Sequence, residues 1–220
     1  MRLALEMKSR WDSSMLIKIN KAFEMTSKNK GDLPLSPFKE TESGLLDFRG
    51  FQLSVPLNRL NIKGIDLSWA SCMWSMNNCI FEDSVLQGSV FDGCILTKQF
   101  LRCNMASISI KNGGLSDSVF TECDFSGAKL ISAMARGAKF IRCNFQKTNL
   151  NKAVFDHCLF EDCSFKGAKF KSSSMIGNKY IGEFPDFHSS EYVMLTSRPV
   201  ELTPQETEQL FIEMQENNDD

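Results

Sequence analysis

The sequence is poor in the residues and motifs that most often carry enzyme chemistry. It has two histidines, His157 and His188, among 220 residues, and it contains no glycine-rich phosphate loop, no HExxH and no GxSxG motif. It also has no run of 18 or more apolar residues, which excludes a membrane-spanning helix. The start, MRLALEMKSRWDSS, lacks the apolar core of a signal peptide. A cytoplasmic location is therefore the default expectation, with secretion by a non-classical signal as the alternative.

Charge is nearly balanced over the whole chain but unevenly distributed along it. The net charge is −2, yet residues 125–180 sum to +7 and residues 181–220 to −9. Hydrophobic residues make up 42%, which is enough to build a core. A basic body followed by an acidic segment bears on partners and self-contacts more than on the fold.

A five-residue period dominates the sequence. Every fifth residue from Leu115 to Phe170 is Leu or Phe, except Ala135, and the residue two before each of these centres is small. Neither an α-helix nor a flat strand has this period. The pattern predicts a square coil in which the large centre and its small partner point inward and the other three residues face solvent. One coil cannot bury its own core, so several must stack at β-ladder spacing.

This pattern resembles the pentapeptide-repeat family, whose consensus is Ala-(Asp/Asn)-Leu-X-X and in which four pentapeptides form one 20-residue coil. The best matches are CDFSG (123–127), AKLIS (128–132), CNFQK (143–147), TNLNK (148–152), CSFKG (163–167) and AKFKS (168–172). Weaker matches extend the resemblance to residues 46–180. The resemblance implies an all-β fold, a right-handed quadrilateral β-helix of about seven coils. Shifts of phase predict short steps of four residues near 53–57, 72–76 and 101–105.

The eight cysteines fit the repeat better than they fit a metal site or a disulfide framework. Seven occupy the small inward position, and Cys103, Cys123, Cys143 and Cys163 are spaced by 20 residues. We expect these four to form one buried column of small apolar side chains. No CxxC pair or Cys/His zinc spacing occurs, so we expect no metal site and no cofactor.

The two ends of the chain predict caps for the open ends of the solenoid. We divide the chain into an N-terminal helix and linker (1–44), the solenoid (45–182) and an acidic C-terminal segment (183–220). Leu16, Ile19 and Phe23 give residues 13–27 an amphipathic helical pattern, followed by a linker at 31–37. Thr203 and Pro204 begin a second expected helix, 203–216. Its apolar edge, formed by Leu210, Phe211 and Met214, would cap the rod or mediate a homodimer.

We expect no catalytic residue. His157 lies in an outward position beside inward Cys158, so the two side chains should diverge, and a convex rod offers no enclosed pocket. Charged pairs such as Arg136 with Asp156 should align on the surface of adjacent coils, where exposed pairs contribute little stability. The chain is therefore expected to act through its surface and not as an enzyme.

The candidate partner-binding residues are outward-facing apolar residues with basic neighbours. Met134 and Val154 fall in one column and Val119 and Leu159 in another. Arg136, Lys139 and Ile141 lie close to them in the repeat. An apolar centre with a charged rim is typical of a protein-binding face, whereas scattered apolar residues are normal on any surface.

The resemblance implies two kinds of protein partner. We expect a non-enzymatic scaffold of the bacterial immunity or effector type, which would bind a toxin or a host protein. The alternative is a DNA mimic that binds a topoisomerase, DNA gyrase, although the +7 charge of the best-formed coils departs from the acidic surface of such proteins. We expect no membrane partner. Specific nucleic-acid binding is also not expected, because the aromatic rings are buried and the basic residues fall on several faces.

Overall fold

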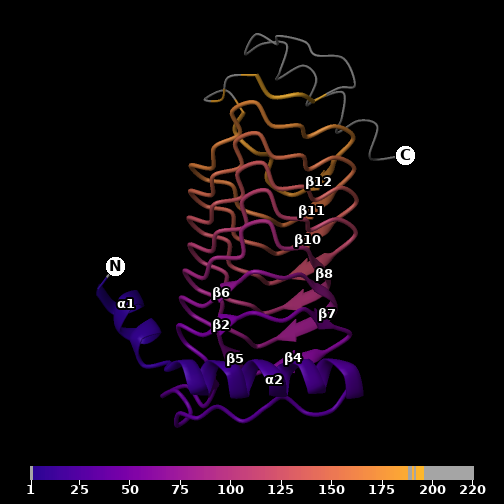
Figure 1. Cartoon of the computed structure of the whole chain (residues 1–220). Helices are drawn as coiled ribbons and strands as arrows, with labels where there is room; N and C mark the ends of the chain where they lie inside the picture. Colours follow the sequence, from indigo (N-terminus) through magenta and orange to yellow (C-terminus); the bar gives the residue numbers. More distant parts are fainter. Residues whose placement is uncertain (1, 188–189, 191, 196–220) are drawn as a thin grey trace.

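The computed structural model describes residues 2–187, 190 and 192–195 of the chain. It is a four-sided β-solenoid of about seven coils with two helices at its N-terminal end (Figure 1), which confirms the expected fold class. No helix among these residues is long and apolar enough to cross a membrane. The expected C-terminal helix 203–216, with Leu210, Phe211 and Met214, lies outside the described residues, as does His188.

The coils are joined by parallel β-ladders, and each coil turns through four sides. The longest sheet contains β3, β4 and β7 to β12, while β1 pairs with β5 and β2 pairs with β6. The strands are β1 (Leu46–Asp47), β2 (Gln52–Leu53), β3 (Leu57–Asn58), β4 (Asn61–Lys63), β5 (Ile65–Asp66), β6 (Ser71–Cys72), β7 (Met76–Glu82), β8 (Leu96–Leu101), β9 (Val119–Thr121), β10 (Lys139–Ile141), β11 (Leu159–Glu161) and β12 (Lys179–Ile181).

Each side of the solenoid is defined by one column of buried centres, and we number the sides as faces 1 to 4 in chain order. Face 1 has Phe48, Leu67, Leu86, Met105, Phe125, Phe145 and Phe165 at its centres. Face 2 has Leu53, Cys72, Phe91, Ile110, Leu130, Leu150 and Phe170. Face 3 has Leu57, Met76, Leu96, Leu115, Ala135, Phe155 and Met175. Face 4 has Ile62, Phe81, Phe100, Phe120, Phe140, Phe160 and Tyr180.

The length of a coil changes along the rod. In the lower coils partners in the ladder are 19 residues apart, as in Asp66↔Val85, and in the upper coils they are 20 apart, as in Asp124↔Asn144. The expected short steps at 53–57 and 72–76 agree with the buried centres. The third expectation, 101–105, was wrong. The step falls between Leu96 and Phe100, where the pairing of β7 with β8 shifts register.

The core is built from stacked rings. On face 1 the ring centroids of Phe125 and Phe145 are 5.1 Å apart, and those of Phe145 and Phe165 are 5.2 Å apart. On face 4 a continuous stack runs from Phe81 to Tyr180, with neighbouring centroids 4.8 to 5.3 Å apart. Ala135 leaves room in its column, and the Phe155 ring there approaches Phe140 at 5.6 Å. These contacts confirm the expected columns.

All eight cysteines are buried and free. The expected column runs along face 1, where the thiol of each of Cys103, Cys123, Cys143 and Cys163 meets a carbonyl oxygen of the coil below at 3.4 to 3.5 Å. Cys72 is the exception to the small inward position, because it occupies a centre of face 2. The cysteines therefore serve as packing residues.

Two helices begin the chain. Helix α1 (Arg2–Ser9) was not expected from the sequence, whereas α2 (Ser13–Asn29) includes the predicted 13–27. Helix α2 lies across the open end of the first coil (Figure 1) and buries Ile19 and Phe23 against it. The side chain of Asp12 accepts a hydrogen bond from the Met15 amide at 2.8 Å and so caps the N-terminus of α2.

The cap satisfies backbone groups that the first coil would otherwise leave unpaired. Asn20 donates to the Gln52 carbonyl at 2.9 Å and accepts from the Ser54 amide at 2.7 Å. The indole of Trp11 donates to the Arg49 carbonyl at 2.8 Å. Side chains of the cap thus make the hydrogen bonds that a further coil would otherwise make with the first coil.

A buried carboxylate joins the two helices to the first coil. Asp47 accepts hydrogen bonds from the guanidinium groups of Arg10 and Arg49. Burial alone would raise the pKa of Asp47, but these bonds outweigh it and hold the pKa well below its usual range. At the other end of the rod, the bridge Ser174↔Met194 continues the ladder of face 3 beyond residue 182.

Candidate functional site

The side chains with reactive groups are not arranged for catalysis in the described part of the chain. His157 is exposed and Cys158 is buried, as the repeat predicted. Burial raises the pKa of the Cys158 thiol to about 12, so this thiol stays protonated near neutral pH. No group of three or more His, Cys, Asp or Glu side chains among the described residues is placed to hold a metal ion.

One expected surface pair has a different environment from the one predicted. Asp156 was placed on the surface beside Arg136, but it is buried. It accepts hydrogen bonds from the Ser174 hydroxyl at 2.6 Å and from the Ile176 amide at 3.1 Å, and it lies 3.5 Å from the Arg136 guanidinium. Asp156 thus connects its own coil to the adjacent coils and has a structural role.

Face 3 carries an exposed apolar column. Met134 and Val154 are adjacent in the ladder, and the same column continues downward through Gly114 to Ile95. Met134 is 50% exposed and Ile95 is 45% exposed. Gly114, between them in the ladder, contributes no side chain to the column. The predicted pair therefore belongs to a longer apolar strip, which we call the face 3 strip (Ile95, Gly114, Met134 and Val154).

The other candidate residues lie around the next turn of the coil. Val119, Lys139 and Leu159 are adjacent in the ladder of face 4. Ile141 points outward from the same strand as Lys139. The turn that carries Arg136 separates this group from the face 3 strip, so the seven candidates occupy two adjoining faces.

Ile95 is the apolar residue that the sequence did not single out. It belongs to CILTK (94–98), where the phase of the repeat is about to change. Only the ladder Ile95↔Gly114↔Met134 places it in line with the predicted pair. The signal in the sequence was an isoleucine in the outward position before a centre.

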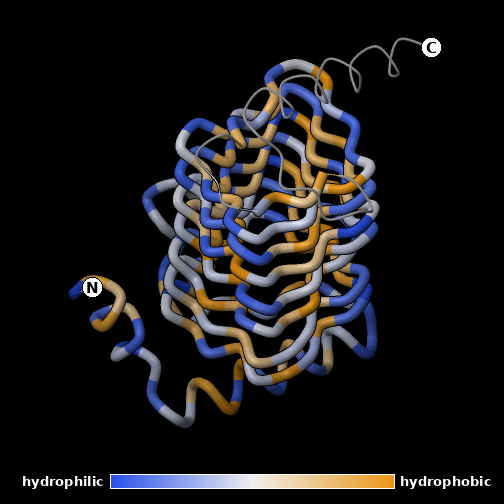
Figure 2. Tube along the Cα trace, turned by 90° about the horizontal axis from the view of Figure 1, so that it is seen from above, coloured by the Kyte–Doolittle hydropathy of each residue, from blue (hydrophilic) through white to orange (hydrophobic). Residues whose placement is uncertain are grey.

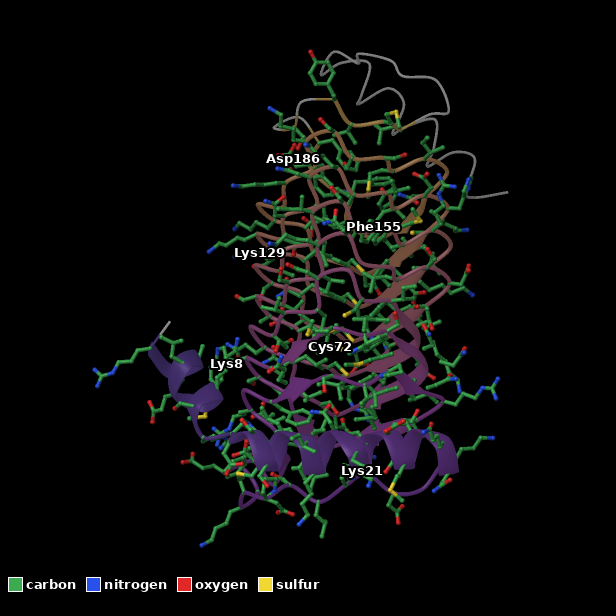
Figure 3. All side chains as sticks on the ribbon, in the orientation of Figure 1. Lys8, Lys21, Cys72, Lys129, Phe155 and Asp186 are labelled. Atoms are coloured by element: carbon green, nitrogen blue, oxygen red, sulfur yellow. The ribbon has the colours of Figure 1, made fainter. Side chains whose placement is uncertain are left out.

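The basic residues fall on several faces of the solenoid, as the sequence indicated. Some lie on face 4 and its bordering turns, where several pair with carboxylates, and a second group of seven lysines lies on face 2 and its two bordering turns. This group comprises Lys111, Lys129, Lys147, Lys152, Lys166, Lys169 and Lys171. Figure 3 shows Lys129 pointing away from the rod.

Two open hollows lie at the base, where the end of α2 meets the first coils. Their volumes are about 550 and 570 Å³, and both are lined by Lys30 and Arg59. Both open widely to solvent and have mixed polar and apolar walls. Neither hollow contains a cluster of groups suited to catalysis.

The repeat and the four-sided coil agree with a match to a family model. The model for the pentapeptide repeat region matches residues 95–170. Residues 95–170 therefore form a pentapeptide repeat region. Pentapeptide-repeat proteins are in general non-catalytic scaffolds. No curated protein matches the sequence significantly.

Solved structures with a similar solenoid are distant in sequence. A trypsin-treated QnrB1, a plasmid-mediated fluoroquinolone resistance protein, is 14% identical, with a TM-score of 0.38, and the alignment covers 76% of this chain and 84% of that one. HetL, involved in heterocyst differentiation regulation in the cyanobacterium Nostoc sp. strain PCC 7120, is 13% identical, with a TM-score of 0.18 and coverage of 70% and 93%. These likenesses add nothing to the assignment of function.

Proposed function

We propose that this pentapeptide-repeat protein is a non-enzymatic scaffold that binds a protein partner through the face 3 strip. The observation that carries the proposal is the alignment of exposed Ile95 and Met134 with half-buried Val154 in one outward column. A soluble rod has no need of an apolar column on a side that is open to solvent. The rigid ladder also holds these side chains in fixed positions, which lowers the entropy cost of binding.

The surroundings of the strip have the composition of a protein interface. Arg136 stands exposed at its border, and Lys139 and Ile141 continue the surface around the turn. Apolar residues at the centre and charged residues at the rim are the usual arrangement in such contacts. The partner would be a toxin or a host protein, as for the immunity and effector proteins of this family.

The experiment is a pull-down with the full chain, followed by titration of the captured protein with single variants. Met134→Glu and Val154→Lys place a charge at the centre of the strip and should weaken binding at least tenfold. Val85→Lys is the matched control for Val154→Lys, because Val85 is also a half-buried outward valine in the ladder but lies on face 1. Unchanged binding by both strip variants would remove face 3 from the proposal.

Gyrase binding by DNA mimicry remains the alternative within the family. It needs a strongly negative surface along the rod, and the lysines of face 2 oppose that. A supercoiling assay separates the two functions, because a DNA mimic inhibits or protects gyrase at micromolar concentration. We expect no effect on supercoiling.

A further inference from the structure

Face 2 differs from the other faces in its charge. The coil geometry brings seven lysines to this side, and we call them the lysine face: Lys111, Lys129, Lys147, Lys152, Lys166, Lys169 and Lys171. Lys129 and Lys169 point outward from the middle of the face, two coils apart. The other five stand at the turns on either side, so the array covers the full width of the face.

Acidic neighbours are scarce on this side of the rod. In the first seven coils the one carboxylate on face 2 and its turns is Asp92, whose Oδ2 lies 3.2 Å from Lys111 Nζ. Asp186 follows at the upper end of the rod (Figure 3). Lys129, Lys147, Lys152, Lys166 and Lys169 form no ion pair with any described residue. By contrast, Arg142 at the turn between faces 4 and 1 pairs with Glu122 at 2.9 Å.

The lower part of the same face is apolar. Val90 points outward in the ladder below Lys129, with Ser109 between them. At one border Met73 is 70% exposed and Trp74 is 52% exposed. The Gln52 amide lies 3.9 Å from the sulfur of Met73, which places this side chain on face 2.

Helix α1 stands at the other border. Gly50, at the turn between faces 1 and 2, lies so close to the backbone of Met7 that a Cβ there would be 2.4 Å from its carbonyl carbon. On α1, Leu5 is 63% exposed and Leu3 is 50% exposed, and Arg2 and Lys8 are exposed beside them. Figure 3 shows Lys8 and Lys129 on the same side of the rod, and Figure 2 shows α1 beside the body in the view from above.

We propose that face 2, together with α1, binds the surface of an anionic phospholipid bilayer. Stable attachment of a peripheral protein needs two signals, apolar insertion and basic residues near the headgroups. Helix α1, through Leu5, and the lower part of face 2, through Met73 and Trp74, supply the first signal, and tryptophan favours the membrane interface. The lysine face supplies the second. Surface attachment of this kind needs no membrane-spanning helix.

The arrangement fits a lipid surface better than a nucleic acid. The lysine part of the face has no aromatic side chain on which bases could stack. It also contains no arginine, whose planar fork suits paired contacts with phosphates. The lysines spread over a flat side instead of following a single track. Flexible lysines on a flat face can each reach the headgroups of a planar bilayer.

The test is sedimentation of the full chain with vesicles of phosphatidylcholine alone or with phosphatidylserine added to about a third. We expect binding to the anionic vesicles, with affinity that falls as salt concentration rises. The double variant Lys129→Glu with Lys169→Glu should bind at least about twenty-five-fold more weakly, because each lysine near an anionic surface contributes a factor of about five. Leu5→Glu should also weaken binding.

The matched control is Lys139→Glu with Lys179→Glu, which makes the same change in net charge on face 4. These two lysines are also exposed and two coils apart in one ladder. We expect at most a threefold effect. An equal loss in both double variants, or no binding to anionic vesicles, would overturn the proposal. Tighter binding to duplex DNA than to vesicles at the same salt, lost in the face 2 variant, would overturn it in favour of nucleic acid.

Discussion

At the scale of single residues, side-chain size is most tightly restricted at the inward position two residues before each centre. Gly113 occupies this position on face 3, where the coils above have Ala133 and Ala153. A Cβ at Gly113 would be 2.4 Å from the side chain of Ile110 and 2.8 Å from the Cys94 carbonyl oxygen. The repeat suggests that alanine would fit, but the local backbone leaves no room for it.

We therefore expect Gly113→Ala to lower the free energy of unfolding by about 1–3 kcal/mol, the usual cost of overpacking a core. Gly114→Ala is the control, because a Cβ there would be 3.4 Å from Ile95, an ordinary contact. Urea unfolding followed by circular dichroism measures both variants. Equal stability of the two would contradict the assignment of Gly113 to a closed position.

The thiols give a second prediction for single residues. Burial raises the pKa of Cys79 and Cys158, and neighbouring thiols together with burial raise the pKa of Cys123. All eight thiols are also buried, so a reagent reaches them only when the chain opens, and the native protein should react with a thiol reagent at pH 8 at least a hundredfold more slowly than the protein in urea. Rapid labelling of several cysteines in the native state would contradict a purely structural role.

At the scale of secondary-structure elements, the attachment of α1 and α2 to the first coil depends on Asp47. The lowered pKa means that the folded state holds this carboxylate charged, so its contribution is present at neutral pH and is lost as the pH falls through and below about 4. Asp47→Asn should be less stable than the unchanged protein at pH 7, and the difference should shrink as the solution is made more acidic. Thermal unfolding between pH 7 and pH 3 measures this.

The control for this prediction is Asp83→Asn. Asp83 pairs with Arg102 at 2.6 Å, but both side chains are well exposed, so the pair should contribute little to stability. A similar loss of stability in the two variants at pH 7 would show that burial of Asp47 is unimportant.

The sequence predicted the repeating elements well because each centre is constrained in the same way by the coils above and below it. The prediction was wrong at positions that lack a coil on one side. Phe51, a large ring at the small inward position of the first coil, fits because Trp11 lies against it at 4.8 Å. Helix α1 was missed because it has only eight residues and buries no side chain against the solenoid. The lysine face was missed because its lysines are dispersed along the sequence and come to one side only when each residue is assigned to one of the four faces.

At the scale of the whole molecule, the solenoid is a stack in which each coil contacts its two neighbours. Such arrays tolerate the gain or loss of a whole unit, because the interfaces on either side of the change stay the same. In the upper part of the rod the unit is 20 residues, since Asp124 lies in the ladder beside Asn144 and Asn144 beside Ser164. The lysine face and the face 3 strip result from the same repeat period, which places equivalent residues of successive coils on one side.

Deletion of residues 125–144 should therefore give a folded protein with one coil fewer. Asp124 would then precede Phe145 in place of Phe125, and these two rings already lie in one stack, 5.1 Å apart. The rod should shorten by roughly 4.8 Å, which small-angle scattering measures, and the circular dichroism spectrum should keep its shape. Deletion of residues 125–142 is the control. It joins Asp124 to Cys143, puts a small residue in the place of a large centre, and shifts every later centre out of phase. That protein should unfold or aggregate, and equal folding of the two deletions would contradict the five-residue rule on which every assignment of a residue to a face depends.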